Sequence, residues 1–154
     1  MLDHLFPRPS DLSYSGSRFA VWLAMLLVLV KMAIALGSIF NGHYAASVAD
    51  GIPLDTYTPS GAQAVLALFA SLGFSQLLLG VVGLLVIARY RALLPGYLLL
   101  LVLEHVGRKA IALLLPIPRV GGSGGGAVSW VFIALLAFAL VLSLRSRSTT
   151  TSAA

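Results

Sequence analysis

The side chains best suited to chemistry lie together in one aliphatic stretch of the sequence, between Pro95 and Leu115. This stretch contains an acid, an imidazole and two bases within a short run: Glu104, His105, Arg108 and Lys109. A separation of four residues places Glu104 and Arg108 on one face of a helix, so that they can form an ion pair. An acid and bases in apolar surroundings could hold such a pair, transfer a proton or bind an anionic ligand.

Two more polar residues interrupt other apolar stretches, Lys31 in the first and Gln76 in the second. At a rise of about 1.5 Å per residue, Lys31 and Glu104 lie at similar depths along antiparallel helices. Gln76 shares a helical stripe with small residues, which allow a neighbouring helix to approach closely; these are Ala70, Gly73, Gly80 and Gly83. We therefore predict a buried polar cluster and possible ligand site made of Lys31, Gln76, Glu104, His105, Arg108 and Lys109. Glu104 is expected to be ionised and to bridge Lys31 and Arg108, because an unpaired charge is costly in low dielectric.

The cluster has two interpretations. It is either a structural set of contacts that holds helices together, or a site for a ligand, a proton or catalysis. A metal site needs three or four ligands, whereas the sequence has no cysteine and only three scattered histidines. The glycines of 121–126 lack the lysine and hydroxyl residue of a phosphate-binding loop, and no nucleophile-elbow motif is present. We therefore predict no catalytic, cofactor-binding or metal-binding residue.

The composition indicates a membrane protein. Of the 154 residues, 59% are hydrophobic and 10% are charged, whereas soluble domains have about 25% charged residues. A soluble fold of this size could not bury so much apolar surface, which excludes ordinary cytosolic, coiled-coil and disordered proteins. The net charge of +5 fits membrane orientation and anionic lipid. No nucleic-acid-binding motif accompanies it.

Four apolar stretches are each long enough to cross a bilayer as a helix, which takes about 17–25 residues. Helices are expected because a strand edge facing lipid would leave backbone groups unpaired. The predicted fold class is all-α, an integral membrane four-helix bundle in a single domain over residues 19–144. Its helices are expected at about 19–40, 61–88, 95–115 and 127–144. The first stretch is too long for a signal peptide and contains Lys31, so we expect it to be retained.

The distribution of arginines predicts the orientation. One side of the membrane would hold six of them, and the other side only Arg119; the six are Arg8, Arg18, Arg89, Arg91, Arg145 and Arg147. We therefore place the N-terminal segment 1–18, the short turn around Arg89-Tyr90-Arg91 and the polar, disordered tail 145–154 in the cytoplasm. The protein would lie in the inner (cytoplasmic) membrane as a multi-pass protein with both termini cytoplasmic.

Two loops would face away from the cytoplasm. Asn41–Ser60 is the longer one, and Pro116–Gly126 is expected to be flexible because it is rich in glycine. Within the longer loop, Asp50-Gly51 is typical of a turn. Thr58 or Ser60 is expected to cap the second helix.

The layout of the chain resembles a known group of small membrane proteins. Four short helices, the basic turn Arg89-Tyr90-Arg91 before Pro95, and charges deep in the third helix are similar to the DoxX-like four-helix bacterial membrane proteins and their uncharacterised relatives. The resemblance is one of layout and covers helices two to four. It implies a bacterial accessory subunit or a protein of undefined activity, and it transfers no functional residue to this chain.

Three functions are compatible with these features, and we predict the first. It is a non-enzymatic accessory or structural subunit of a larger inner-membrane complex, because the chain is small and its fourth helix is uncharged and suited to lipid or partner contact. The second is an oligomeric carrier for a small molecule, an anion or protons, lined by Lys31, Glu104, His105 and Arg108. The third is a lipid-modifying enzyme with Glu104 or His105 as general acid or base. The expected partners are the bilayer with its anionic lipids, and other membrane subunits or a second copy of the chain, without nucleic acid or a cofactor.

Overall fold

The computed structural model describes residues 16–120 and 124–145, and these residues are helical without any strand. Four long helices account for most of them: α2 (Arg18–Phe40), α4 (Pro59–Arg89), α5 (Leu94–Leu114) and α6 (Gly124–Leu144). Each apolar stretch of the sequence forms one of these helices. The expectations for residues 1–15, for 121–123 of the glycine-rich loop and for 146–154 of the tail lie outside the described residues.

Three of the helices are long and apolar enough to cross a membrane: α2, α4 and residues Gly126–Leu144 of α6. Helix α5 has the same length as α6, 21 residues, but it carries Glu104, Arg108 and Lys109 in its second half. Length and composition alone therefore do not mark α5 as a span. Large apolar side chains face outwards, as in a membrane protein; Trp22, for example, is 74% exposed.

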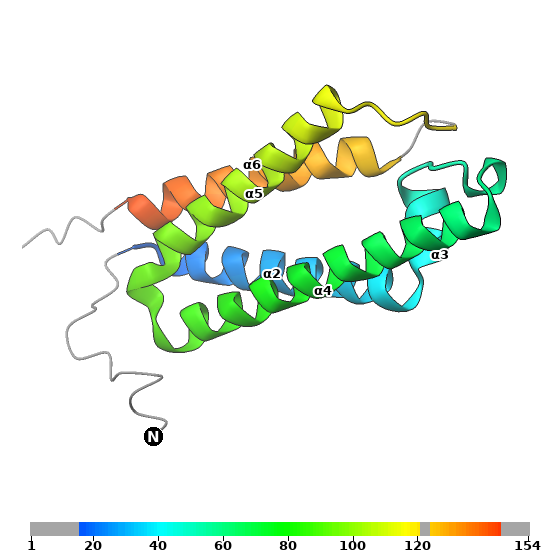
Figure 1. The fold of residues 1–154 in the computed structure, drawn as a ribbon. Helices are drawn as coiled ribbons and strands as arrows, with labels where there is room; N and C mark the ends of the chain where they lie inside the picture. The colour runs from blue at the N-terminus through cyan, green and yellow to red at the C-terminus, as the bar shows by residue number, and fades with distance from the viewer. Residues whose placement is uncertain (1–15, 121–123, 146–154) are drawn as a thin grey trace, which may run out of the picture.

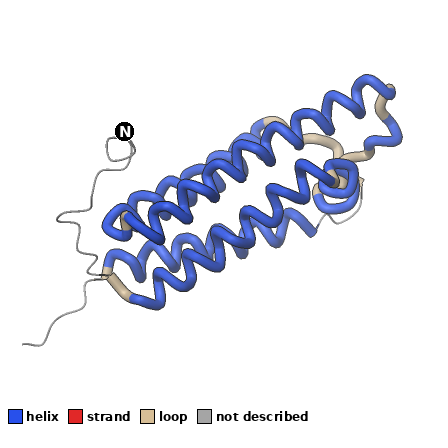
Figure 2. The backbone as a smooth tube through the Cα atoms, turned by 90° about the horizontal axis from the view of Figure 1, so that it is seen from below, coloured by secondary structure: helices blue, strands red, loops and turns tan. Residues whose placement is uncertain are grey.

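The helices form two layers (Figure 1). In one layer α2 packs along α4, in the other α5 packs on α6, and α2 also contacts α6. Successive long helices run in opposite directions, so the start of α2, the turn between α4 and α5, and the end of α6 share one end of the bundle. The loops after α2 and after α5 lie at the other end, as Figure 2 also shows. We call these the turn end and the loop end.

Helix α4 starts earlier than the hydrophobic pattern predicts. Thr58, one of the two expected caps, accepts a hydrogen bond from Gly61 N at 3.2 Å. Pro59 then occupies the first turn, where its missing N–H costs nothing. The helix therefore begins at Pro59, and Ser60 lies inside it.

The loop that follows α2 is folded over the helix ends. It contains three short helical segments: α3 (Gly42–Tyr44), η1 (Ala45–Ala49) and η2 (Leu54–Thr56). A small core of its own holds it together, made of Ala46, Ile52 and Leu54. The predicted turn is present at Gly51, whose φ of 70° suits glycine. Val120 N donates to Gly51 O at 2.9 Å and so joins the second loop to the first.

Small residues allow α4 to approach both of its neighbours closely. A Cβ at Gly73 would lie 2.8 Å from Ala35 O of α2. A Cβ at Gly83 would collide with the hydroxyl of Tyr97 of α5, and that hydroxyl donates to Leu79 O at 2.9 Å. The glycine stripe predicted on α4 therefore faces α2 along its length and α5 near the turn end.

Helix α5 is buried over its first half only. Its buried residues are Leu94, Tyr97, Leu98 and Leu101, which join the main core formed with α2 and α6. Towards the loop end α5 diverges from α4 (Figure 1), and its last residues, 111–114, are all exposed. The charged residues of α5 lie between its buried first half and its exposed C-terminal end.

Candidate functional site

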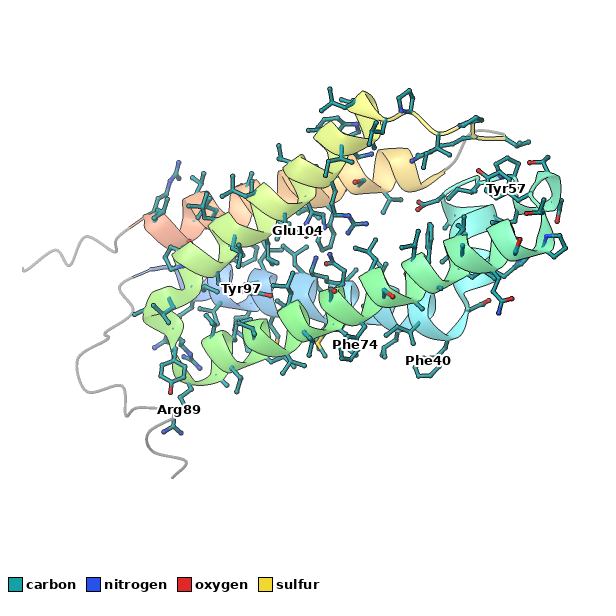
Figure 3. All side chains as sticks on the ribbon, in the orientation of Figure 1. Phe40, Tyr57, Phe74, Arg89, Tyr97 and Glu104 are labelled. Carbon is teal, nitrogen blue, oxygen red and sulfur yellow. The ribbon has the colours of Figure 1, made fainter. Side chains whose placement is uncertain are left out.

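Three helices bring polar side chains together near the middle of the bundle. Helix α2 supplies Lys31, α4 supplies Gln76 and α5 supplies Glu104. Figure 3 shows Glu104 turned from α5 towards the layer of α2 and α4. Lys31 belongs to the buried stripe of α2, and Gln76 to the glycine stripe of α4. The shared depth of Lys31 and Glu104 that the sequence predicts is therefore realised as a direct contact.

Both carboxylate oxygens of Glu104 have two partners each. Lys31 Nζ donates to Oε2 at 2.9 Å, and His105 Nδ1 lies 2.7 Å from the same oxygen. Gln76 Nε2 donates to Oε1 at 2.6 Å, and Arg108 Nη1 donates to it at 3.3 Å. An ionised carboxylate offers about four lone-pair sites, and these four contacts engage both of its oxygens. The bridge between Lys31 and Arg108 expected from the sequence is present, and Gln76 and His105 complete it.

The burial of these side chains differs sharply. Lys31 is 4% exposed and Gln76 is 8% exposed, while the side chains of Glu104 and His105 are 17% and 12% exposed. Arg108 stands apart with a side chain that is 47% exposed. The Lys31–Glu104 pair is thus the enclosed centre of the cluster, and Arg108 is its open edge.

His105 connects the cluster to the fourth long helix. Its Nδ1 lies 2.9 Å from Leu101 O as well as close to Glu104 Oε2. Both neighbours are acceptors, so Nδ1 carries the proton and donates. The imidazole ring stacks on Phe132 of α6, with centroids 5.1 Å apart and planes at 28°. His105 therefore holds Glu104 and α6 in place at once.

Lys109, the sixth residue of the predicted cluster, turns away from Glu104. Its Nζ donates to Gly126 O at 3.3 Å and lies 5.7 Å from the centre of the Trp130 ring. Both partners belong to the first turns of α6, at the loop end of the bundle. A long lysine side chain reaches polar groups at a helix end in this way while its stem stays among apolar groups. Lys109 thus fastens α5 to α6 and is not part of the carboxylate site.

One buried polar atom of the cluster has no partner among the described residues. It is Oε1 of Gln76, the acceptor end of the amide whose Nε2 donates to Glu104. This orientation of the amide is required, because turning it over would place two acceptors, Oε1 of Gln76 and Oε1 of Glu104, against each other.

The sequence pattern did not identify three aromatic contacts of the site. Tyr97 fills the space left by Gly83, Phe132 stacks on His105, and Trp130 lies beside Lys109. The glycine stripe indicates that something large approaches α4, but it does not say which side chain. Phe132 and Trp130 belong to an apolar helix in which spacing alone does not distinguish one aromatic residue from another.

No protein-family model matches this chain, and no curated protein or solved structure is significantly similar to it. The resemblance to the DoxX-like group therefore rests on helix layout alone. The arguments about function come from the residues and their geometry.

A cavity of about 570 Å³ lies at the loop end, away from the carboxylate. It opens between α2, α3 and the start of α4, and His43 and Gln63 are its most polar lining residues. None of the six cluster residues lines it. Within residues 16–120 and 124–145, no three His, Asp or Glu side chains gather as a metal site requires.

The chemical capacity of the cluster follows from these contacts. A general base needs a lone pair within reach of the proton that it takes, and both oxygens of Glu104 are already engaged by neighbouring side chains. What the cluster does well is to join helices, because its contacts link α2, α4 and α5, with α6 added through His105.

Proposed function

We propose that all four long helices cross the inner membrane of a bacterium, with the turn end in the cytoplasm. The 21 residues of α5 span about 31 Å at the helical rise, close to the thickness of the hydrocarbon core. Its charges are compatible with a span, because Glu104 is paired inside the bundle and Lys109 reaches the start of α6. The arginines support the orientation, since the turn end carries Arg89 and Arg91.

We further propose that the protein is a non-enzymatic accessory subunit of a larger membrane complex, and that its polar cluster is structural. The observation that carries this proposal is the occupation of both Glu104 oxygens by Lys31, Gln76, His105 and Arg108. A lipid-modifying enzyme would need Glu104 or His105 free as a general acid or base. Glu104 is engaged by these four side chains, Nδ1 of His105 lies between Glu104 and Leu101 O, and Lys31 is buried at 4% exposure.

The test is gentle extraction of the full-length protein from its native membrane, followed by native mass spectrometry of the intact particle. We expect other polypeptides in fixed stoichiometry with this chain. A lone monomer or homo-oligomer that retains a small molecule would contradict the proposal and identify the molecule. The matched control is the same protein extracted in a harsh detergent, which should separate the subunits.

A carrier of small anions is the second candidate, and one observation favours it. The cluster has more positive than negative charge, and Arg108 is 47% exposed, so its open edge could attract an anion. Four helices enclose little space by themselves, so a pathway would need an oligomer. Anion flux into vesicles that contain only this protein would support the carrier, whereas its absence together with stable partner subunits supports the accessory role.

A further inference from the structure

Arg108 is the charged group of the cluster that other residues cover least. Its Cα lies about 9 Å along α5 from the last residue of the helix, at about 1.5 Å per residue. Side chains of a helix lean towards its N-terminus, and Arg108 follows this rule by reaching back to Glu104. Its guanidinium is therefore held inside the proposed span, while the neighbouring Lys109 reaches the helix end instead.

The cluster leaves Arg108 incompletely neutralised. Lys31 and Arg108 contribute two positive charges against the one negative charge of Glu104, before any charge on His105 is counted. The contact from Arg108 is the longest of the four to Glu104, at 3.3 Å against 2.6–2.9 Å for the others. Among the described residues Glu104 is its hydrogen-bond partner, although a guanidinium has five N–H donors.

The position of Arg108 limits what can cover it. A lipid phosphate stays at the headgroup level, beyond the end of α5, and the guanidinium points the other way. A second copy of this chain would bring the same excess of positive charge, and its own Glu104 is already surrounded by donors. A carboxylate on the transmembrane helix of a different protein meets both conditions, since it can lie at this depth and carries the missing charge.

The surface around Arg108 suits such a helix. Beyond Arg108 the side chains are apolar and exposed: Ile111, about one turn further along α5, is 59% exposed, and Leu115, the C-cap of the helix about two turns further on, is 69% exposed. Helix α4 has diverged from α5 at this level and leaves the face uncovered (Figure 1). We propose that Arg108 is the docking point for an Asp or Glu on a partner transmembrane helix that packs against the second half of α5. This inference rests on the proposed role as a subunit and specifies the chemistry of the partner.

The experiment places a photo-crosslinking amino acid at Ile111 of the otherwise unchanged protein, in native membranes. The matched control is Val131 on α6, which has the same exposure, 59%. We expect Ile111 to crosslink to a transmembrane segment that has an Asp or Glu within about one helical turn of the crosslink, and Val131 not to do so. A segment without an acid, a second copy of this chain, or lipid alone at Ile111 would overturn the inference.

Substitution of Arg108 supplies the second readout. Arg108→Gln should lower the crosslinking yield at Ile111 at least about tenfold, since a desolvated charge pair across an interface loses that much when one partner is neutralised, and Arg108→Lys should retain part of it. Arg108→Asp combined with an arginine in place of the partner's acid should restore the yield. An unchanged yield in Arg108→Gln overturns the inference. An unchanged yield together with partner subunits in native mass spectrometry would refute the docking role of Arg108 and leave the proposed accessory function standing. If native mass spectrometry finds no partner subunit, the docking role and the accessory function both fail.

Discussion

Neutralising Glu104 should destabilise the bundle by far more than the loss of its hydrogen bonds. In Glu104→Gln the ammonium of Lys31 stays 4% exposed and loses the carboxylate that lies 2.9 Å away. A buried charge left without its partner costs about 3–5 kcal/mol. A polar contact between membrane helices contributes about 0.6 kcal/mol on average and about 1.7 at most. An unpaired buried charge and a lost polar contact therefore predict different changes in the free energy of unfolding. For Glu104→Gln we expect a loss of about 3 kcal/mol or more.

A double-mutant cycle with Lys31 isolates the charge pair. Lys31→Met should cost less than Glu104→Gln, about 1–3 kcal/mol, because Glu104 keeps Gln76, His105 and the opposite charge of Arg108. In the double variant no unpaired ammonium remains at this position. The combined loss should therefore be smaller than the sum of the single losses by about 1–3 kcal/mol.

Unfolding in mixed micelles with increasing SDS measures these differences, with the fluorescence of the two tryptophans as the signal. Ser75→Ala is the control, because Ser75 is exposed beside Gln76 and its hydroxyl donates to Ser71 O of its own helix. It should unfold like the unchanged protein. Losses that add in the double variant, or a loss in Glu104→Gln below about 1.7 kcal/mol, would refute a buried ion pair at the centre of the bundle.

Two further predictions concern packing and orientation. Gly73→Ala should destabilise the protein by about 1–3 kcal/mol in the same assay, because the new methyl group would lie 2.8 Å from Ala35 O. Gly107→Ala is the control and should be neutral or stabilising, because a Cβ at Gly107 would have nothing within 4 Å. Equal effects of the two substitutions would contradict the close approach of α2 and α4. The chain has no cysteine, so single cysteines report sidedness: a membrane-impermeant maleimide added to spheroplasts should label Asp55→Cys, and should label Leu93→Cys only after lysis. The reverse pattern would invert the proposed orientation.

The helices could be predicted from the sequence because their apolar runs are longer than a core helix of a soluble protein needs. The glycine stripe with Gln76 also identified the packed face of α4, since close packing of helices requires small residues at regular spacing. The depth of Lys31 and Glu104 followed from counting residues along two antiparallel helices. These features depend on local spacing, which the linear chain contains.

Other features of the site depend on contacts between distant segments. Lys109 and Arg108 are adjacent in sequence and have the same charge, yet one reaches Gly126 and the other Glu104. The contact of Arg108 with Glu104 lies within α5 and follows from the four-residue spacing, whereas the placement of α6 decides the partner of Lys109. The stacking of His105 on Phe132 has the same origin.

The folded loop between α2 and α4 also combines a feature that the sequence predicts with one that it does not. The turn at Gly51 was predictable from the Asp-Gly pair. The small core of Ala46, Ile52 and Leu54 was not, because short apolar residues in a loop have no periodicity that indicates where they pack. Its contact with Val120 joins residues that are far apart in the chain.

Composition and periodicity thus indicate helices apolar enough to cross a membrane, with an acid and several bases within the apolar stretches of the sequence, since hydrophobic length and helical spacing are properties of consecutive residues. The fold adds that polar side chains from three helices engage both oxygens of Glu104, while the side chain of Arg108 remains 47% exposed. The Lys31–Glu104 pair is therefore enclosed between helices, whereas the charge of Arg108 is accessible from outside the bundle. It depends on how far α5 diverges from α4, and this divergence is set by packing among all four helices.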